Sequence, residues 1–231
     1  MAQIGVSAMK RIEDLLDTGS FVEIGSYISS RNTDFNLSDK ETPKDGVLTG
    51  YGTINDGLVY VYSQDPSVLG GSIGEMHAKK IVSLYDMAMK MGAPVVGLVD
   101  CAGLRLEESF DALDAFGKIY LAQTKASGVI PQIQAVFGLS GGGMAISNGL
   151  SDFVFMEQDK AKVFVNSPNA INGNSQDKND FSSAKFQSES TGLVDFIGTE
   201  SEIISGIREL ISVLPANNED DMSYMECNDD L

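Results

Sequence analysis

The chain has 231 residues, of which 42 % are hydrophobic, and its 33 acidic and 16 basic side chains give a formal net charge of −17. Such a charge argues against a nucleic acid partner, and the apolar runs are far too short to cross a bilayer. The only two cysteines, Cys101 and Cys227, lie far apart, and no C-x-x-C motif occurs. A disulfide framework and a zinc ribbon are therefore excluded, and with no signal-peptide pattern at the start we expect a cytoplasmic protein.

Hydrophobic periodicity and turn residues predict a series of helices and strands. The tripeptide Asn55-Asp56-Gly57 between two apolar runs is a strong hairpin signal. In chain order the predicted elements are a helix over 7–17, a polar loop over 30–46, hairpin strands over 47–54 and 58–63, a helix over 72–92, a strand over 95–99, a helix over 110–126, a strand over 133–137, the start of a helix over 144–149, short strands over 153–156 and 162–165, a polar loop over 168–190, and a closing helix over 200–214.

The alternation of Val/Ile/Phe-rich strands with helices favours an α/β fold with a mostly parallel sheet that is covered on both faces. One folded domain over 1–216 accounts for all of these elements. The remaining residues, 217–231, hold six acidic side chains and no basic one. We expect this tail to be solvated and mobile, and the alternative is that it docks onto a basic partner chain.

The stretch VFGLSGGGMAISNGL over 136–150 contains G-x-S-x-G, the turn that presents a nucleophilic serine in many hydrolases. A serine hydroxyl needs a base, which is usually a histidine. The only histidine is His77, and none follows Ser140 as the hydrolase order requires. The sequence therefore argues against a serine hydrolase and predicts a structural or ligand-edge role for His77.

The glycines of this stretch suggest a different chemistry. Gly142 and Gly143 open a predicted helix, where the first N–H groups are unpaired and the helix dipole is positive. A second loop, 100–108, also leaves the C-terminal end of a strand, where parallel sheets bind ligands. Two such loops can bind a developing oxyanion through backbone N–H groups, although a packing turn explains either loop alone equally well. Arg105 in the second loop is, on the same reasoning, more often a partner of Asp100 or Glu108.

The two loops resemble a known family. DCAGLRLEE (100–108) resembles the D-S-G-G-A-R-x-Q-E motif of the carboxyltransferase subunits of biotin-dependent acyl-CoA carboxylases and decarboxylases, and FGLSGGGMAIS (137–147) resembles their G-P-x-A-G-G-A-x-Y-S loop. Further matching pieces are LLDTGSFVEIG, DGVLTGYGTI, VYSQDPSVLGGSIGEMHAKKIV and ASGVIPQIQAVFG. Their order and spacing hold over about 10–165, and propionyl-CoA carboxylase β chains show the same pattern.

The resemblance implies a crotonase-like ββα spiral that moves carboxylate between N-carboxybiotin, on a separate carrier protein, and the α-carbon of an acyl-CoA. It places the thioester enolate against the backbone N–H groups of Gly142 and Gly143 in one loop and of Gly103 and Leu104 in the other. It also places Arg105 near the acyl-CoA. No metal is implied. For the CoA phosphates the candidates are Arg105 and the two lysines of the 72–92 helix, Lys79 and Lys80, each of which is as readily a surface charge.

The resemblance covers only the first of the two spiral domains that the family carries in tandem. It therefore implies a second carboxyltransferase chain as a partner and an oligomeric complex, with no carboxyl transfer by this chain alone. Ala102, Leu104 and Glu107 depart from the family pattern, and so do 164–168 and 182–187. These departures leave open a specialised substrate or a subunit that has lost catalysis. The alternatives to a biotin-dependent carboxyltransferase are a malonyl-thioester decarboxylase subunit that works without biotin and a non-catalytic scaffold subunit.

Overall fold

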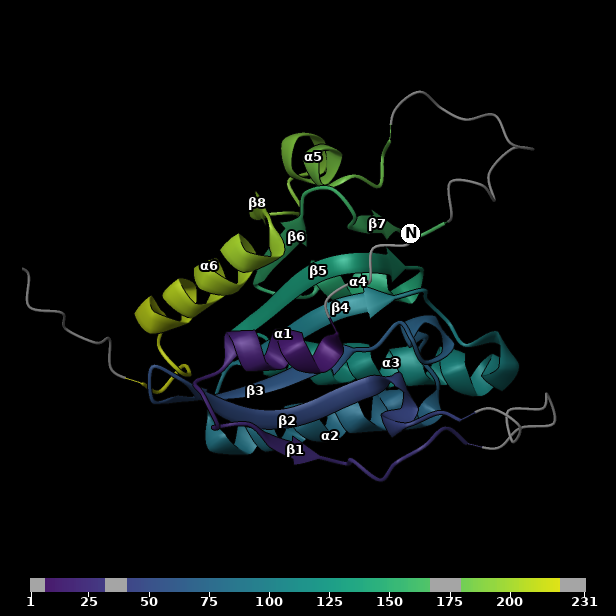
Figure 1. The fold of residues 1–231 in the computed structure, drawn as a ribbon, viewed down its shortest axis with the longest axis horizontal. Coiled ribbons are helices and arrows are strands. Elements are labelled where there is room, and N and C mark those ends of the chain that lie inside the picture. The colour runs from purple at the N-terminus through teal and green to yellow at the C-terminus, as the bar shows by residue number, and fades with distance from the viewer. Residues whose placement is uncertain (1–6, 32–40, 167–179, 221–231) are drawn as a thin grey trace, which may run out of the picture.

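The architecture is a single sheet between two layers of helices (Figure 1). The computed structural model describes residues 7–31, 41–166 and 180–220. Within them the sheet has eight strands in the order β1-β2-β3-β4-β5-β6-β8, with β7 paired to β5. None of the helices in these ranges is long and apolar enough to span a membrane.

The N-terminal edge of the sheet is an antiparallel meander of β1 (Val22–Ile24), β2 (Val47–Ile54) and β3 (Gly57–Gln64). The predicted hairpin is confirmed. Its two loop residues, Asn55 and Asp56, have φ angles of 51° and 66°. Positive φ at both positions is what a two-residue hairpin turn of type I′ requires.

From β3 onward all strand pairs are parallel, which confirms the mostly parallel sheet predicted from the sequence. These strands are β4 (Val95–Cys101), β5 (Gln132–Gly141), β6 (Phe153–Glu157), β7 (Lys162–Phe164) and β8 (Phe196–Gly198). Parallel strands place their carboxyl ends at one edge, so the loops that follow β3, β4 and β5 lie close together.

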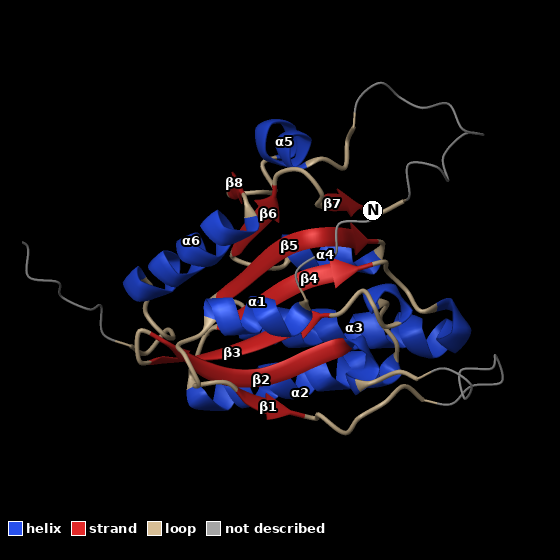
Figure 2. Cartoon of the chain, viewed as in Figure 1, coloured by secondary structure: helices blue, strands red, loops and turns tan. Residues whose placement is uncertain are grey.

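Helices cover both faces of the sheet (Figure 2). The helices α1 (Ala8–Leu15) and α6 (Glu200–Val213) pack on one face, and α2 (Glu75–Met91) and α3 (Ser109–Ala126) pack on the other with α4 (Gly143–Gly149). The remaining helical segments are α5 (Ala184–Phe186), a π turn over Gln187–Thr191, and short 3₁₀ turns over Lys44–Gly46, Leu69–Gly71 and Leu106–Glu108.

Strand alternation divides the core between the two faces. In β4, Val95 and Val99 join the core under α2 and α3, whereas Val96 and Leu98 join the core under α1 and α6. All four side chains are fully buried. A strand whose successive side chains are buried on opposite faces has to be apolar throughout, which is why β4 reads as a continuous Val/Leu run.

The structure corrects the sequence reading in three places. The predicted loop 168–190 holds α5 and the π turn in its described part, where Ser183 caps α5 by accepting from the N–H of Phe186. The strand predicted over 133–137 continues to Gly141. The first residues of the predicted tail contact the folded body, because Asn217 donates to Gly92 O and the N–H of Asn218 donates to Val129 O, both at 2.9 Å. Residues 221–231 lie outside the described ranges.

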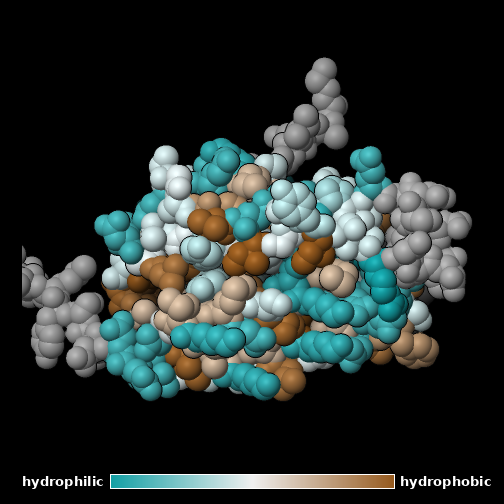
Figure 3. Space-filling view, turned by 90° about the horizontal axis from the view of Figure 1, so that it is seen from below, coloured by the Kyte–Doolittle hydropathy of each residue, from teal (hydrophilic) through white to brown (hydrophobic). Residues whose placement is uncertain are grey.

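The lower face of the molecule, where β1 and α2 lie, mixes hydrophilic with scattered hydrophobic residues (Figure 3). The exposed apolar side chains of α3 include Leu121, at 54 %, and the three most exposed ones lie in its N-terminal half and the turn before it. They are Leu106, Phe110 and Leu113, with exposed fractions of 78 %, 83 % and 61 %.

Candidate functional site

Loops that follow β3, β4 and β5 meet at the carboxyl edge of the sheet. The N–H of Ala102, after β4, donates to Gly70 O, after β3, at 2.9 Å. Next to this contact Ile73 forms a parallel bridge with Leu104. The loop after β3 and the loop after β4 are therefore joined main chain to main chain, which fixes their relative position without side chains.

The loop after β4 also lies directly against the end of β5. A Cβ atom on Gly141 would stand 2.8 Å from Ala102 O, and one on Gly103 would stand 3.2 Å from Gly141 O. At Gly141 this distance is shorter than real Cβ atoms show, so only glycine lets the two loops come this close. The two glycine loops predicted to act together are indeed brought into contact.

Gly142 forms the turn between β5 and α4. Its φ of 60° and ψ of −124° are open to glycine and strained for other residues. Apart from its chain neighbours, no heavy atom of the residues that the structure describes lies within 4 Å of the position that a Cβ would take, so these residues leave the space beside Gly142 open. The strained residue of this strand-to-helix turn thus presents bare backbone instead of a nucleophilic side chain.

The four residues predicted as N–H donors fall into two pairs. The N–H of Gly142 donates to Phe164 O at 2.9 Å, and the N–H of Gly103 lies 3.3 Å from Cys101 Sγ. Among the hydrogen bonds of the described residues, none uses the N–H of Gly143 or of Leu104. Gly143 is the first residue of α4, where an N–H has no partner within the helix.

Leu104 presents its N–H because of the bridge to Ile73. The N–H of Ile73 donates to Gly103 O at 2.9 Å, and the N–H of Arg105 donates to Ile73 O at 3.0 Å. In an extended segment successive peptide groups point to opposite sides, so the N–H and C=O of Leu104 point away from Ile73. Leu104 and Gly143 are both partly exposed residues.

Neither Ser140 nor His77 is arranged for nucleophilic catalysis. Ser140 is fully buried, and its Oγ accepts from Asn148 Nδ2 at 3.0 Å. The His77 ring is also fully buried, with Nδ1 2.9 Å from Asp45 O and Nε2 3.2 Å from Gln64 Nε2. Burial lowers the pKa of His77 well below its usual value, so the ring is neutral. The structural role predicted for His77 fits these contacts.

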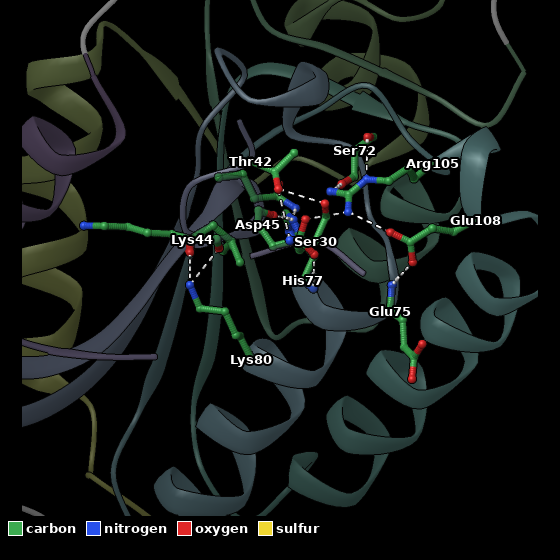
Figure 4. A network of polar contacts seen from close by, with 12 residues as sticks. Ser30, Thr42, Lys44, Asp45, Ser72, Glu75, His77, Lys80, Arg105 and Glu108 are labelled. Atoms are coloured by element: carbon green, nitrogen blue, oxygen red, sulfur yellow. Dashed lines mark hydrogen bonds and ion pairs between the residues drawn. The ribbon is translucent and has the colours of Figure 1, made fainter. Parts of the chain in front are cut away.

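Of the three side chains predicted to meet CoA, two point into the protein (Figure 4). Arg105 is 1 % exposed and forms ion pairs with Asp45 and Glu108. Lys80 is 4 % exposed and donates to Lys44 O and Val47 O. Burial lowers the pKa of Lys80 to about 8.

The third, Lys79, is exposed and pairs with Glu75 at 2.7 Å. Sequence reasoning missed a second surface cation here, Arg31, which pairs with the same Glu75 at 3.0 Å and with Asp111 in the first turn of α3. Only the placement of the preceding loop brings Arg31 to this point, and no motif marks it.

Of the two partners expected for Arg105, Glu108 is confirmed, and Asp100 lies beside Arg11 instead. The Oδ2 atom of Asp100 lies 3.6 Å from Arg11 Nη1, and its Oδ1 accepts the N–H of Leu139 at 3.2 Å. Gly138 leaves room for this carboxylate, since a Cβ there would stand 2.2 Å from Asp100 Oδ1. Burial raises the pKa of Asp100. The side chain therefore clamps the C-terminal part of β5 to the end of β4.

No group of His, Cys, Asp and Glu side chains that could hold a metal ion occurs in the described part of the chain. The open space beside Gly142 and the N–H groups of Gly143 and Leu104 instead suit a carbonyl oxygen that becomes negative. A thioester carbonyl and the ureido carbonyl of biotin both have this character, so the residues present fit either group.

The chain matches the model of the carboxyl transferase domain over residues 6–231. It is 41 % identical to the methylmalonyl-CoA decarboxylase subunit alpha of Veillonella parvula, over 99 % of this chain and 46 % of that protein. It is 39 % identical to the propionyl-CoA carboxylase beta chain of Roseobacter denitrificans, over 92 % and 42 %. The chain spans about half the length of the curated relatives it matches.

Solved structures show the same architecture. Transcarboxylase 12S, a hexamer solved with hydrolysed methylmalonyl-coenzyme A bound, superposes with a TM-score of 0.92 at 34 % identity, over 97 % of this chain and 44 % of that one. A Pseudomonas malonate decarboxylase hetero-tetramer in complex with malonate superposes with a TM-score of 0.79 over 90 % of this chain and 82 % of the matched chain. At 22 % identity the second likeness concerns the fold alone.

Proposed function

Because the chain belongs to the carboxyl transferase domain family, we propose that it is one half of a split carboxyltransferase acting on an acyl-CoA. The family and the crotonase-like α/β fold expected from the sequence are both confirmed. The proposed reaction moves a carboxylate between N-carboxybiotin, carried on a separate protein, and the α-carbon of the acyl-CoA. Biotin, when bound, supplies the carboxyl group that is gained or lost, and acyl-CoA is the substrate.

One observation carries this proposal: the strand-to-helix turn at Gly142 presents backbone, not a nucleophile, beside a second backbone loop. Loss or gain of a carboxylate at an α-carbon leaves negative charge on the thioester oxygen. The N–H of Gly143, at the positive end of α4, points its dipole at such a charge. One preorganised donor of this kind is worth about 2.7–4 kcal/mol in the transition state.

The donor pair that we propose is Gly143 and Leu104. It replaces the four-residue set expected from the sequence, because the N–H groups of Gly142 and Gly103 have acceptors within the chain. Gly142 keeps a role as the residue that leaves space for the thioester. Leu104 offers its N–H whatever its side chain is, and that side chain narrows the space for the acyl group.

The CoA phosphates need a cation that solvent can reach. Arg105 and Lys80 are buried, whereas Lys79 is exposed close to the N-terminus of α2. We therefore keep Lys79 as the candidate phosphate partner and add Arg31. Lys79→Ala should weaken the binding of methylmalonyl-CoA to the assembled complex in calorimetry, and Lys125→Ala, at the far end of α3, is the matched control.

A second carboxyltransferase chain is the partner that the proposal requires. The chain covers 46 % and 42 % of two relatives that are longer single chains. The exposed stripe of Leu106, Phe110 and Leu113 lies directly after the candidate loop. An apolar stripe of this kind marks an interaction surface, and we propose that the second chain covers it. A free, buried thiol at Cys101 agrees with a cytoplasmic complex.

Two measurements test the proposed function. A pull-down from native extract should recover a second carboxyltransferase-like chain and a biotinylated carrier protein. The assembled complex should then exchange carboxylate between methylmalonyl-CoA and the carrier, and the isolated chain should not. An acyl-carrier subunit in place of the biotin protein would favour malonyl-thioester decarboxylation. Binding without turnover would favour a scaffold, and robust transfer by the isolated chain would exclude the split site.

A further inference from the structure

We infer that Arg105 is a positioning residue, which ties three loops together and holds the N–H of Leu104 in place without touching the substrate. This inference rests on the proposed function for its catalytic consequence. Its structural content stands independently, on the contacts of the guanidinium and of the segments that those contacts join.

The guanidinium is completely enclosed by protein acceptors. Its Nη1 donates to Asp45 Oδ1 at 2.5 Å and to Glu108 Oε1 at 2.9 Å, and its Nη2 donates to Ser72 O at 2.7 Å. Nε lies 3.4 Å from Ser72 Oγ. Gly74 makes this possible, because a Cβ there would stand 2.5 Å from Nη1. The planar fork of arginine matches this set of acceptors, whereas the single point charge of lysine does not.

Main-chain and side-chain contacts of Arg105 converge on the same segment. Its N–H donates to Ile73 O at 3.0 Å. Its guanidinium donates to the neighbouring Ser72 O (Figure 4). The residue before it, Leu104, is thereby held at a fixed orientation relative to the start of α2. A guanidinium that left its site would release one end of the bridge and let the Leu104 N–H move.

The other end of the network is a strained turn. Lys44, Asp45 and Gly46 have φ angles of 57°, 52° and 70°, three consecutive left-handed residues. Such backbone persists only where its surroundings fix it. Here the Asp45 carboxylate accepts from Arg105 and from the N–H of His77 at 2.7 Å, and Lys80 donates to Lys44 O. Burial raises the pKa of Asp45, and the Arg105 guanidinium opposes that rise.

Glu108 extends this network to the N-terminus of α2. Its Oε2 accepts the N–H of Glu75, the first residue of α2, at 2.6 Å, while Oε1 accepts from Arg105. Gly74 at the N-cap has no side chain to satisfy that N–H, so Glu108 takes the capping role. Arg105 carries one positive charge and faces two carboxylates, Asp45 and Glu108, and the positive N-terminus of α2 offsets part of the additional negative charge. Arg105 therefore couples the turn at 44–46, the loop at 72–74 and the loop at 103–108.

Amide hydrogen exchange on the isolated chain tests the positioning directly. Arg105→Lys keeps the charge and loses the fork, so exchange in peptides covering 70–74 and 103–106 should accelerate about tenfold or more, while the hairpin over 47–64 stays protected. Glu108→Gln, which keeps the shape, should accelerate the same peptides. Arg208→Lys is the matched control, because it removes a guanidinium that pairs with Asp17, outside this network. Unchanged exchange at 70–74 and 103–106 in both network variants would overturn the inference.

Binding and turnover of the assembled complex test the consequence for catalysis. With methylmalonyl-CoA as the probe, Arg105→Lys should change Kd by less than about threefold and lower kcat by about 10- to 100-fold, because small displacements of a reacting geometry are costly. A tenfold rise in Kd with kcat unchanged would instead make Arg105 a direct substrate ligand. A wild-type complex without any transfer activity would remove the proposed function, and the exchange result would still decide the positioning role.

Discussion

The main-chain N–H of Gly142 donates a hydrogen bond to the carbonyl oxygen of Phe164 across 2.9 Å. This contact belongs to the parallel pairing of β5 with β7, in which Gly141 lies opposite Phe164. A donor that is already paired inside the chain cannot stabilise an oxyanion without breaking that bond. The neighbouring Gly143, first in α4, is the donor that the fold leaves for a ligand.

Replacing single backbone N–H groups by ester oxygens separates these two glycines. An ester at position 143, introduced with glycolic acid, should lower kcat of the assembled complex by about 10²–10³-fold, the usual cost of losing one oxyanion donor. An ester at position 142 removes the bond to Phe164 instead. The ester at position 142 should therefore lower Tm, and it should lower kcat less than the ester at position 143 does. Equal turnover of the 143 ester and the wild type would eliminate Gly143 as a donor.

Adding a methyl group at Gly143 tests how tightly the turn is packed. A Cβ there would stand 2.6 Å from Tyr120 Oη and 2.7 Å from Phe116 Cδ1, so Gly143→Ala should destabilise the fold by about 1–3 kcal/mol. Gly117→Ala is the matched control. Gly117 is an exposed residue of α3, and outside the helix backbone no atom of the described residues lies within 4 Å of its Cβ position, so the change should stabilise by about 0.5–1 kcal/mol. Denaturant unfolding measures both, and a neutral Gly143→Ala would show that the turn is looser than the structure indicates.

The long helices were predictable because their apolar positions repeat with helical spacing over many residues. In α2 the predicted stripe of Ile81, Leu84, Tyr85 and Ala88 is buried throughout. The strands β1 and β8 were not predicted, because three residues carry little periodicity. The equally short β7 was predicted because it belongs to the apolar run over 163–165. The pairing partners of β1 and β8 lie far along the chain, and a local pattern contains no information about them.

The glycine loops of the site were predictable from their residues. Which of their polar groups are already hydrogen-bonded within the chain was not. Whether the Gly142 N–H is available depends on Phe164, and whether Arg105 is available depends on Asp45, 60 residues away. The sequence does offer one signal for such an arginine. Glu108 stands three residues after it, a spacing at which two side chains can meet within one turn, and this pairing is confirmed.

The ion pair of Asp17 with Arg208 gives a pH dependence with a definite sign. Hydrogen bonds from Arg208, at 2.8 Å, and from the N–H of Asp56 lower the pKa of Asp17. A carboxylate with a lowered folded pKa stabilises the fold above its unfolded pKa of about 4, and this stabilisation is lost as the pH falls through the folded pKa.

Asp17→Asn should therefore lower Tm at pH 7, and the difference from wild type should shrink as the pH is lowered below about 4. Asp14→Asn is the control, since Asp14 lies in the last turn of α1, three residues before Asp17, and pairs with the exposed Lys10. Thermal melts from pH 2 to pH 8 provide the measurement. A difference that stays constant over this range would show that Asp17 stabilises the fold by packing and not by charge.

The exposed stripe beside the site makes assembly testable apart from folding. Phe110 is 83 % exposed and contributes little to the core, so Phe110→Glu should change the free energy of unfolding by no more than about 0.5 kcal/mol. If the second chain covers this stripe, burying a carboxylate there should cost about 2 kcal/mol or more of binding energy, which is the size of a hot-spot loss. Met91→Glu, also at an exposed apolar residue but at the end of α2, should leave binding unchanged. Titration of the two purified chains in calorimetry compares the three proteins, and equal affinity of Phe110→Glu and wild type would place the partner on another face.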